Sequence, residues 1–333
     1  GVAWVRAVTR EAGTEAGEAG PVVLGSGYLK VIRHADSLGL ERLADRMARD
    51  YGHPQDFIAR RELGNLLATE AYHGGLRDGS AFHIHPLRYA RVLISLALKA
   101  GVTIHEQSRA ISMRLRNGTW IIRSKAGHVA ADCVILANNA QRGPGRDVNR
   151  AIVPVATYMA SVASPSGRLG QAIRFGGCIG DTRRASDYYR VVDSPEGAVL
   201  LWGGRITTRR SQPRRLAERL LDDIRAVYPQ LDDLEVREAW TGIMGYTRHR
   251  MPLIRPMAKG VWAVTGFGGH GLNTSAIAGS LVASALLSGD DRWQLFGSFT
   301  PDRTWGILGR LAAQAQYWRL AAADRIEEAR TRR

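Results

Sequence analysis

The sequence has little cysteine and almost no lysine. Cys133 and Cys178 are its two cysteines, too few for a disulfide scaffold or for a four-cysteine zinc site. We therefore expect a reducing, cytoplasmic environment. The start of the chain lacks the basic, apolar and small-residue succession of a secretory signal peptide, and its first residue is Gly1 rather than Met.

Acidic residues are in the minority, and the net charge is +15. Four of the 46 basic residues are lysines, so arginine supplies the excess charge, a skew typical of coding bias. The densest run, 205–219, holds six arginines and overlaps a helix that apolar spacing predicts over 213–228. Because aromatic residues do not alternate with these arginines, we expect a solvated helix face and no nucleic-acid partner.

No uninterrupted apolar run is long enough to span a membrane. Residues 261–289 contain no Asp, Glu, Lys or Arg, but glycines break this stretch before 272–288. The remaining piece is shorter than the ~20 residues that a span needs. It also holds Asn273, Thr274 and four serines. We therefore predict a buried helix of a soluble domain and no membrane span.

Apolar periodicity predicts strands and helices that alternate along the chain, which indicates a mixed α/β fold. Strands are predicted over 27–31, 108–115, 120–124, 128–136, 152–162, 188–192, 199–203, 236–243 and 260–265. Helices are predicted over 37–51, 59–69, 87–100, 213–228, 272–288 and 305–328.

The most informative segment is 261–272, in which a short apolar strand runs through a glycine-rich loop into a helix of small residues. Gly266, Gly268 and Gly271 satisfy the pattern G-x-G-x-x-G. Glycine lets a ligand approach the backbone, and the first turn of a helix offers unpaired N–H groups to a phosphate, carboxylate or carbonyl. A dinucleotide-binding site is expected to continue with a second strand and an acidic residue about 20 positions further on. Neither follows here. Tight packing of the helix on a sheet is the alternative explanation.

Other candidate sites carry weaker signals. Residues 25–27 contain two glycines, but the third glycine and the helix of a glycine-rich ligand loop do not follow them. His83 and His85 lie two residues apart without a third ligand at a usual spacing, so we predict no metal. Cys133 falls inside a predicted apolar strand and is expected to be an inert core thiol.

Five segments, in this order and at this spacing, carry a resemblance to a known family. They are 79–86, 134–140, 187–190, 240–242 with Thr247, Arg250, Met251 and Pro252, and 268–271. On these residues the sequence resembles the D-amino-acid-oxidase (DAO) superfamily of FAD-dependent oxidoreductases, and within it most closely the γ-glutamylputrescine oxidase branch.

The resemblance implies a partial FAD/NAD(P)-binding domain interleaved with a mixed-sheet substrate domain. The FAD-binding domain is then expected over 86–140 and 260–290, and the substrate domain over 27–85 and 141–259. An irregular segment, 1–26, precedes them, and a helical segment, 291–333, follows.

The resemblance also implies roles for single residues. The backbone of Gly268, Gly269, His270, Gly271 and Leu272 is expected to face the flavin. Ala110 is placed beside the adenine, and Ala137 and Asn138 beneath the cofactor. Tyr189, Met244 and His270 are expected at the substrate pocket, while the catalytic residues stay unassigned.

Family members begin with a βαβ unit that grips the FAD pyrophosphate, and this pattern is not found in residues 1–30. We therefore expect an N-terminally truncated chain, completed by a separate FAD-binding segment. The implied reaction oxidises an amine such as γ-glutamylputrescine by hydride transfer to FAD, with hydrolysis of the imine and formation of peroxide. An inactive fragment or assembly subunit without its own FAD is the alternative. Met244 stands where amino-acid oxidases carry an arginine for the substrate carboxylate, which favours an amine substrate.

Overall fold

The computed structural model describes residues 1–11, 20–34, 37–183, 186–209 and 211–331. It has the mixed α/β fold that the sequence predicts. The chain divides into two compact units. Unit 1 consists of 1–20, 87–155 and 243–313, and unit 2 of 21–86, 156–242 and 314–333. Segments 141–155 and 243–259, which we assigned to the substrate domain, therefore pack within unit 1.

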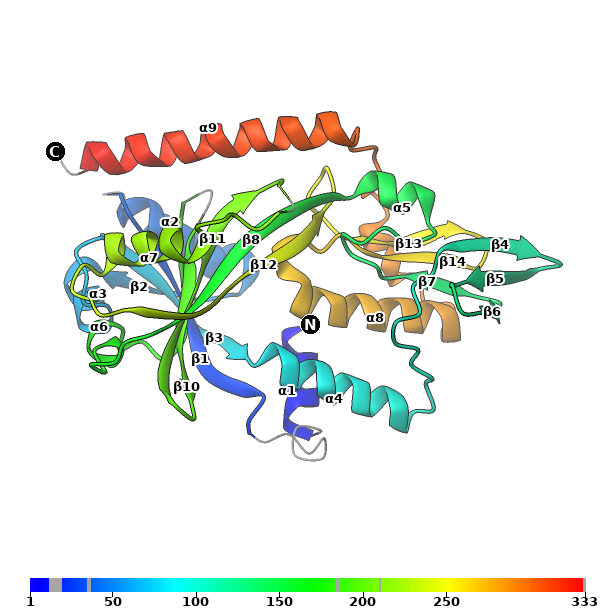
Figure 1. Ribbon diagram of the computed structural model, residues 1–333, viewed down its shortest axis with the longest axis horizontal. Helices are drawn as coiled ribbons and strands as arrows, with labels where there is room; N and C mark the ends of the chain where they lie inside the picture. Colours follow the sequence, from blue (N-terminus) through cyan, green and yellow to red (C-terminus); the bar gives the residue numbers. More distant parts are fainter. Residues whose placement is uncertain (12–19, 35–36, 184–185, 210, 332–333) are drawn as a thin grey trace. The chain divides into compact units, whose positions relative to one another are not determined.

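Unit 2 is built on an eight-stranded mixed sheet with the order β12-β8-β11-β10-β9-β1-β3-β2 (Figure 1). Its strands are β1 (Val23–Ile32), β2 (Asp56–Ala59), β3 (Gly74–Ile84), β8 (Val153–Ala163), β9 (Cys178–Asp181), β10 (Tyr188–Ser194), β11 (Gly197–Thr207) and β12 (Glu235–Tyr246). Its helices are α2 (Ser37–Tyr51), α3 (Arg60–Leu66), α6 (Leu169–Ala172), α7 (Leu216–Val227) and the later part of α9 (Ile307–Thr331).

Helix α7 covers one face of this sheet because its apolar residues recur every three to four positions. All four of the residues that gave the prediction, Leu216, Leu220, Ile224 and Val227, are buried in the core of unit 2. Aromatic rings fill the centre of that core, with Trp202 fully buried. Helix α9 is held on the end of β11 by Gln314, whose Oε1 accepts hydrogen bonds from Thr207 Oγ1 at 2.7 Å and from the Thr208 amide at 2.9 Å.

A buried group of two acids and two arginines lies at the edge of the same core. Arg33 Nη2 is 3.0 Å from Asp187 Oδ2, and Arg33 Nε is 3.0 Å from Asp181 Oδ2. Arg183 also pairs with both carboxylates. Asp181 and Asp187 are 5% and 3% exposed, so each carboxylate depends on these guanidinium groups for its charge balance.

Unit 1 contains two three-stranded sheets. One has the order β13-β14-β7, from Leu253–Ala258 (β13), Val261–Thr265 (β14) and Val134–Leu136 (β7). The other is a meander of β4 (Ser112–Arg116), β5 (Thr119–Arg123) and β6 (His128–Ala131). The helices are α1 (Val2–Glu11), α4 (Pro86–Lys99), α5 (Arg146–Ala151), α8 (Gly271–Ser288) and the start of α9, with 3-10 turns η1 (Gly268–His270) and η2 (Arg292–Phe296).

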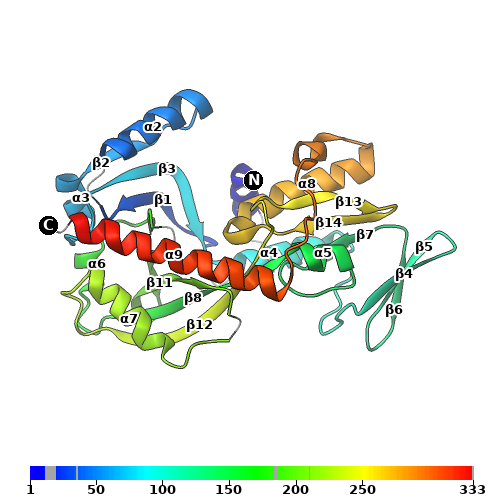
Figure 2. The same cartoon turned by 90° about the horizontal axis from the view of Figure 1, so that it is seen from above.

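Helix α8 lies along the β13–β14 side of its sheet, as Figures 1 and 2 show. Ala278 and Val282 pack there against Ile254 and Val264. These are the two residues of α8 that are buried, so our prediction of a buried helix over 272–288 was wrong for most of its surface. By length and composition, 268–288 is apolar enough to cross a membrane, a test that core helices of soluble proteins also pass.

Two further predictions are corrected. Residues 2–11 of the segment expected to be irregular form α1, and β1 begins at Val23; residues 12–19 lie outside the described part of the chain. The strand predicted over 128–136 is interrupted at Asp132 and Cys133, because β6 pairs with the meander whereas β7 pairs with β14. Cys133 is consequently half-buried between two strands rather than in a core.

Candidate active site

The candidate site lies where two parallel strands end. β7 and β14 are parallel neighbours, with Val134 opposite Val261 and Leu136 opposite Ala263. Their carboxyl ends therefore meet at one edge of the sheet, which is where ligands bind in open α/β sheets. Ala137 and Asn138 follow one strand and the glycine-rich loop follows the other, so the fold brings together two segments more than 100 residues apart (Figure 1).

The glycines of this loop differ in what requires glycine at each position. Gly266 and Gly268 have φ values of +76° and +58°, which L side chains rarely adopt. A Cβ on Gly268 would also lie 2.5 Å from the ring of Tyr246. Gly269, in contrast, has room for a Cβ, because Tyr246 Oη and Met244 Sδ would lie 3.4 and 3.6 Å from it. Its backbone is exposed.

The loop continues through η1 into α8, an 18-residue helix. The first N–H groups of a helix have no acceptor within the helix, and the helix dipole makes that end positive. His270 and Leu272 are exposed there. Exposed glycine backbone next to these N–H groups suits the electron-rich ring edge of a flavin, so the described residues fit the cofactor that the resemblance implies.

Asparagines connect the end of β7 to the end of β12. The side-chain amide of Asn138 donates to the Gln141 carbonyl, which fixes the turn after the strand. Asn139 Oδ1 accepts from the Gly245 amide at 3.0 Å, and its Nδ2 donates to the Ile243 carbonyl at 3.4 Å. A Cβ on Gly245 would lie 2.5 Å from Asn139 Oδ1. Residues 243–246 are thereby held at the same sheet edge as the glycine-rich loop.

Met244 lies beside this loop, and Tyr246 is a site residue that our sequence reasoning missed. Tyr246 pairs with Phe267 in an isolated β-bridge, and its hydroxyl lies 4.0 Å from Met244 Sδ. The two side chains are two residues apart on β12 and therefore project from the same face of the strand. That spacing, next to a predicted pocket residue, was the signal that could have identified Tyr246.

Ala110 lies just before β4 rather than within a strand, because regular pairing of the meander begins at Ser112. Its neighbour Arg109 donates through Nη2 to the Arg142 carbonyl at 3.0 Å. The segment that holds Ala110 is thus joined to the loop that follows Asn138.

Tyr189 lies in the core of unit 2. Its ring stacks on Trp202 with centroids 4.3 Å apart, and its hydroxyl lies 3.0 Å from that of Tyr72 and 2.7 Å from that of Tyr228. Burial raises the pKa of Tyr189 well above its ordinary value. Its position gives no support to the role of pocket wall, because a side chain enclosed by other rings has no surface left for a substrate.

The weaker candidates have structural roles. His83 is buried, and its Nε2 lies 3.2 Å from the Gly176 carbonyl. Gly25 is required because a Cβ there would lie 2.4 Å from that imidazole nitrogen. Among the described residues, no three His, Cys, Asp or Glu side chains come together in a way that could hold a metal ion.

Comparison with known proteins identifies the family of the chain. The family described as "FAD dependent oxidoreductase" (DAO) matches residues 3–285. A probable oxidoreductase OrdL of Rhizobium meliloti is 29% identical over 245 residues, covering 73% of this chain and 56% of its own. The gamma-glutamylputrescine oxidoreductase of Escherichia coli is 26% identical over 252 residues, covering 74% of this chain and 58% of its own. The chain therefore spans less than two thirds of the length of these curated relatives.

Solved structures share the fold. Glycine oxidase from Geobacillus kaustophilus superposes with a TM-score of 0.75 at 20% identity, covering 91% of this chain and 81% of its own. L-proline dehydrogenase from P. horikoshii gives a TM-score of 0.73 at 14% identity, covering 90% and 81%. With a family match over most of its length and this fold, the chain belongs to the DAO family of FAD-dependent oxidoreductases.

Proposed function

We propose that this chain contributes the flavin-facing loop and part of the substrate pocket of an FAD-dependent amine oxidase. The observation that carries the proposal is the exposed glycine backbone at the carboxyl edge of the β7–β14 pair, next to Met244 and Tyr246. The family match supports the cofactor, and the relatives named above support an oxidoreductase.

In this proposal the backbone from Gly268 to Leu272 would hold the flavin ring, with Ala137, Asn138 and Ala110 as the other residues that would contact the cofactor. FAD would supply the hydride acceptor for oxidation of the carbon beside the substrate nitrogen, and water would hydrolyse the imine product. The N–H groups and positive end of α8 stabilise negative charge that develops at the edge of the ring. The carboxyl edge of the sheet orients the ligand, which is the protein's main contribution in flavin enzymes.

The substrate proposed is an amine, with a γ-glutamylated diamine as the preferred example. Met244 has no charge to pair with an α-carboxylate, whereas amino-acid oxidases hold that group with the fork of an arginine. A curated relative, the gamma-glutamylputrescine oxidoreductase, is named for such a substrate.

We expect Met244→Arg to shift the preference of the enzyme toward amino acids. Peroxide release from γ-glutamylputrescine, putrescine, glycine and D-alanine gives kcat/KM for each. The wild type is expected to prefer γ-glutamylputrescine, and Met244→Arg to raise the ratio for glycine by at least about tenfold, since a charged hydrogen bond is worth ~1.5–3 kcal/mol. Ile243→Arg, on the opposite face of β12, is the control. A wild-type preference for glycine or D-alanine would contradict the proposed substrate.

A further βαβ segment is proposed to complete the FAD site. In the described part of the chain, β7 is an edge strand that pairs only with β14. Ile135, which lies on β7, is 48% exposed. Apolar side chains of α8 are uncovered as well, with Leu272, Ile277 and Leu287 among the exposed residues. A parallel strand and its crossover helix bury this kind of surface, because parallel sheets are normally covered on both faces.

Co-expression with such a segment, taken from a curated relative, is expected to raise the soluble yield and to give a yellow protein with flavin absorbance. The chain alone is expected to be poorly soluble and colourless, because its apolar surface stays exposed. Flavin absorbance from the chain alone would contradict the need for the segment. A soluble but colourless complex would instead favour the alternative, an assembly subunit without its own FAD.

A further inference from the structure

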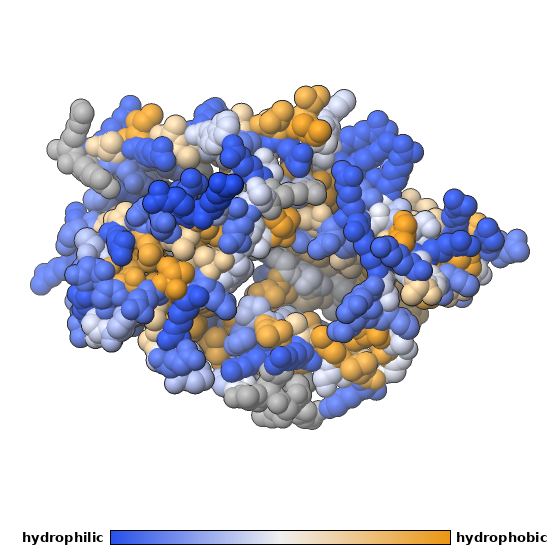
Figure 3. Space-filling model, in the orientation of Figure 1, coloured by the Kyte–Doolittle hydropathy of each residue, from blue (hydrophilic) through white to orange (hydrophobic). Residues whose placement is uncertain are grey.

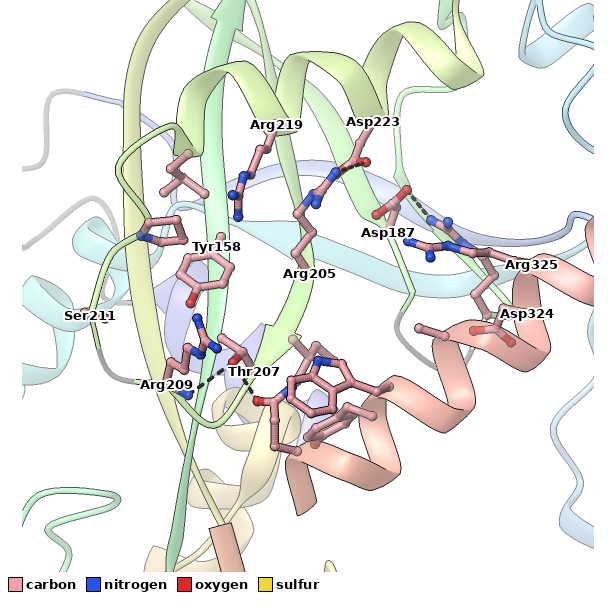
Figure 4. A pocket seen from close by; sticks show the side chains of 18 of the residues that line it. Tyr158, Asp187, Arg205, Thr207, Arg209, Ser211, Arg219, Asp223, Asp324 and Arg325 are labelled. Atoms are coloured by element: carbon pink, nitrogen blue, oxygen red, sulfur yellow. Dashed lines mark hydrogen bonds and ion pairs between the residues drawn. The ribbon is translucent and has the colours of Figure 1, made fainter. Parts of the chain in front are cut away.

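Unit 2 contains a pocket that lies outside the proposed flavin site. It has a volume of about 600 Å³ and lies between the end of β11, α7 and the later part of α9 (Figure 4). Pockets that bind small molecules and cofactors usually measure ~300–1,000 Å³. The proposed function does not use this pocket, and the residues that line it come from unit 2.

Positive charge is in excess along the pocket wall. The lining contains six arginines and four acids: Arg183, Arg205, Arg209, Arg214, Arg219, Arg325, Asp187, Asp223, Asp324 and Glu328. Arg205 makes a two-pronged contact with Asp223, with Nη2 at 2.8 Å from Oδ1, and Arg183 pairs with Asp187. Figure 3 shows strongly hydrophilic side chains over α7 and the segment that precedes it, beside α9.

Four of these six arginines, Arg209, Arg214, Arg219 and Arg325, form no ion pair with an acid among the described residues. Arg209 follows β11 and Arg219 lies on the first turns of α7, and no ion pair joins either of them to a described side chain. Figure 4 shows the ring of Tyr158 between them. Their charges act on the Tyr158 hydroxyl and lower its pKa, against burial, which raises it by more. That hydroxyl has no hydrogen-bond partner within the described part of the chain.

Two guanidinium groups and a phenol form a donor set for the oxygens of a phosphate. A guanidinium can present two parallel N–H groups to a phosphate, and it is less strongly hydrated than an ammonium group. Arginine is therefore favoured wherever a phosphate is recognised by planar, two-pronged hydrogen bonds.

An aromatic surface lies on the α9 side of the same pocket. Trp318 lines the pocket and is 62% exposed. An exposed indole offers a flat apolar face on which the ring of a ligand can stack. The hydrogen bonds from Thr207 and Thr208 to Gln314 hold this part of α9 in place, one turn before Trp318.

We propose that this pocket binds a phosphate-bearing ligand of nucleotide size. The phosphate contacts Arg209, Arg219 and Tyr158, and the aromatic ring of the ligand stacks on Trp318. The pocket volume admits a mononucleotide, and the unpaired arginines supply the charge that its phosphate requires.

Titration calorimetry with AMP, inorganic phosphate and adenosine tests this proposal on the full chain, together with the βαβ segment if solubility requires it. We expect AMP to bind more tightly than either fragment. Arg219→Gln is expected to weaken AMP binding at least about tenfold, because it removes a charged hydrogen-bond donor. Arg225→Gln is the matched control, since Arg225 is exposed on α7 but does not line the pocket.

Trp318→Ala separates the stacking surface from the phosphate contacts. The variant is expected to bind AMP more weakly and to leave the affinity for inorganic phosphate unchanged. Circular dichroism checks that each variant is folded. If Arg219→Gln and Arg225→Gln lose AMP affinity equally, AMP binds through the general positive charge of the surface and not in the pocket. This result would overturn the proposal. The proposal would also be overturned if AMP did not bind at concentrations up to about 10 mM, which corresponds to a binding free energy weaker than ~3 kcal/mol.

Discussion

Gly269→Val is expected to leave unit 1 folded and to abolish FAD binding. A Cβ at this position would lie at ordinary contact distances of 3.4 and 3.6 Å from Tyr246 Oη and Met244 Sδ, so the backbone need not shift to admit it. The added side chain projects from exposed backbone at the start of α8, where close approach of a ligand depends on glycine. The variant therefore separates the role of the loop in binding from its role in folding.

The measurement is the flavin absorbance of the complex with the βαβ segment, with circular dichroism as the test of folding. We expect FAD affinity to fall at least about a hundredfold, or ~2.7 kcal/mol. Gly279→Ala is the control, because this glycine lies on α8 with nothing within 4 Å of an added Cβ. A Gly269→Val variant that holds FAD as well as Gly279→Ala would mean that the loop serves only the packing of α8 on its sheet.

Asp187→Ala is expected to destabilise unit 2 strongly. The substitution leaves Arg33 and Arg183 to share Asp181, with Glu328 Oε1 3.8 Å from Arg183 Nε as the next acid, so the buried group loses one of its two buried carboxylates. Breaking a buried ion pair by removing one partner costs about 3–5 kcal/mol. We expect the urea midpoint to fall correspondingly.

Glu70→Ala provides the comparison for that result. Glu70 Oε2 lies 2.7 Å from Arg60 Nη2, but the Glu70 side chain is 92% exposed. Exposed pairs of this kind contribute about 0–1 kcal/mol. If both variants unfold at the same urea concentration, the buried group does not support the fold in the way argued here.

Helices were the most predictable part of the fold because their ends carry local signals. Pro86 begins α4 and Gly289 ends α8 in a left-handed conformation, with φ +68°, and both helices were predicted to within one residue. Strand β3 was missed, since its glycines weaken the strand pattern. Gly75 is explained by a partner distant in sequence, because a Cβ there would lie 3.1 Å from Leu29.

The candidate site was only partly predictable for the same reason. The glycine-rich loop could be recognised locally, and the pairing of β7 with β14 then joined it to Asn138. The two-residue spacing from Met244 pointed to Tyr246, but its contact with Gly268 is created by the fold and could not be predicted. Tyr189 could not be distinguished by sequence from a pocket residue, because the tyrosines that surround it come from other segments. The cytoplasmic location stays a prediction.

The interleaving of the two units has a consequence for biosynthesis. Strands β1 to β3 leave the ribosome before roughly 70 residues of unit 1, and β8 to β12 emerge only afterwards. At a translation rate of about 5–20 residues per second, the strands that complete the sheet are synthesised on the order of ten seconds after the first strands. Exposed strand edges of this kind are aggregation-prone. Nascent chains of this protein are therefore expected to depend on holding chaperones, and slower translation is expected to lengthen that dependence.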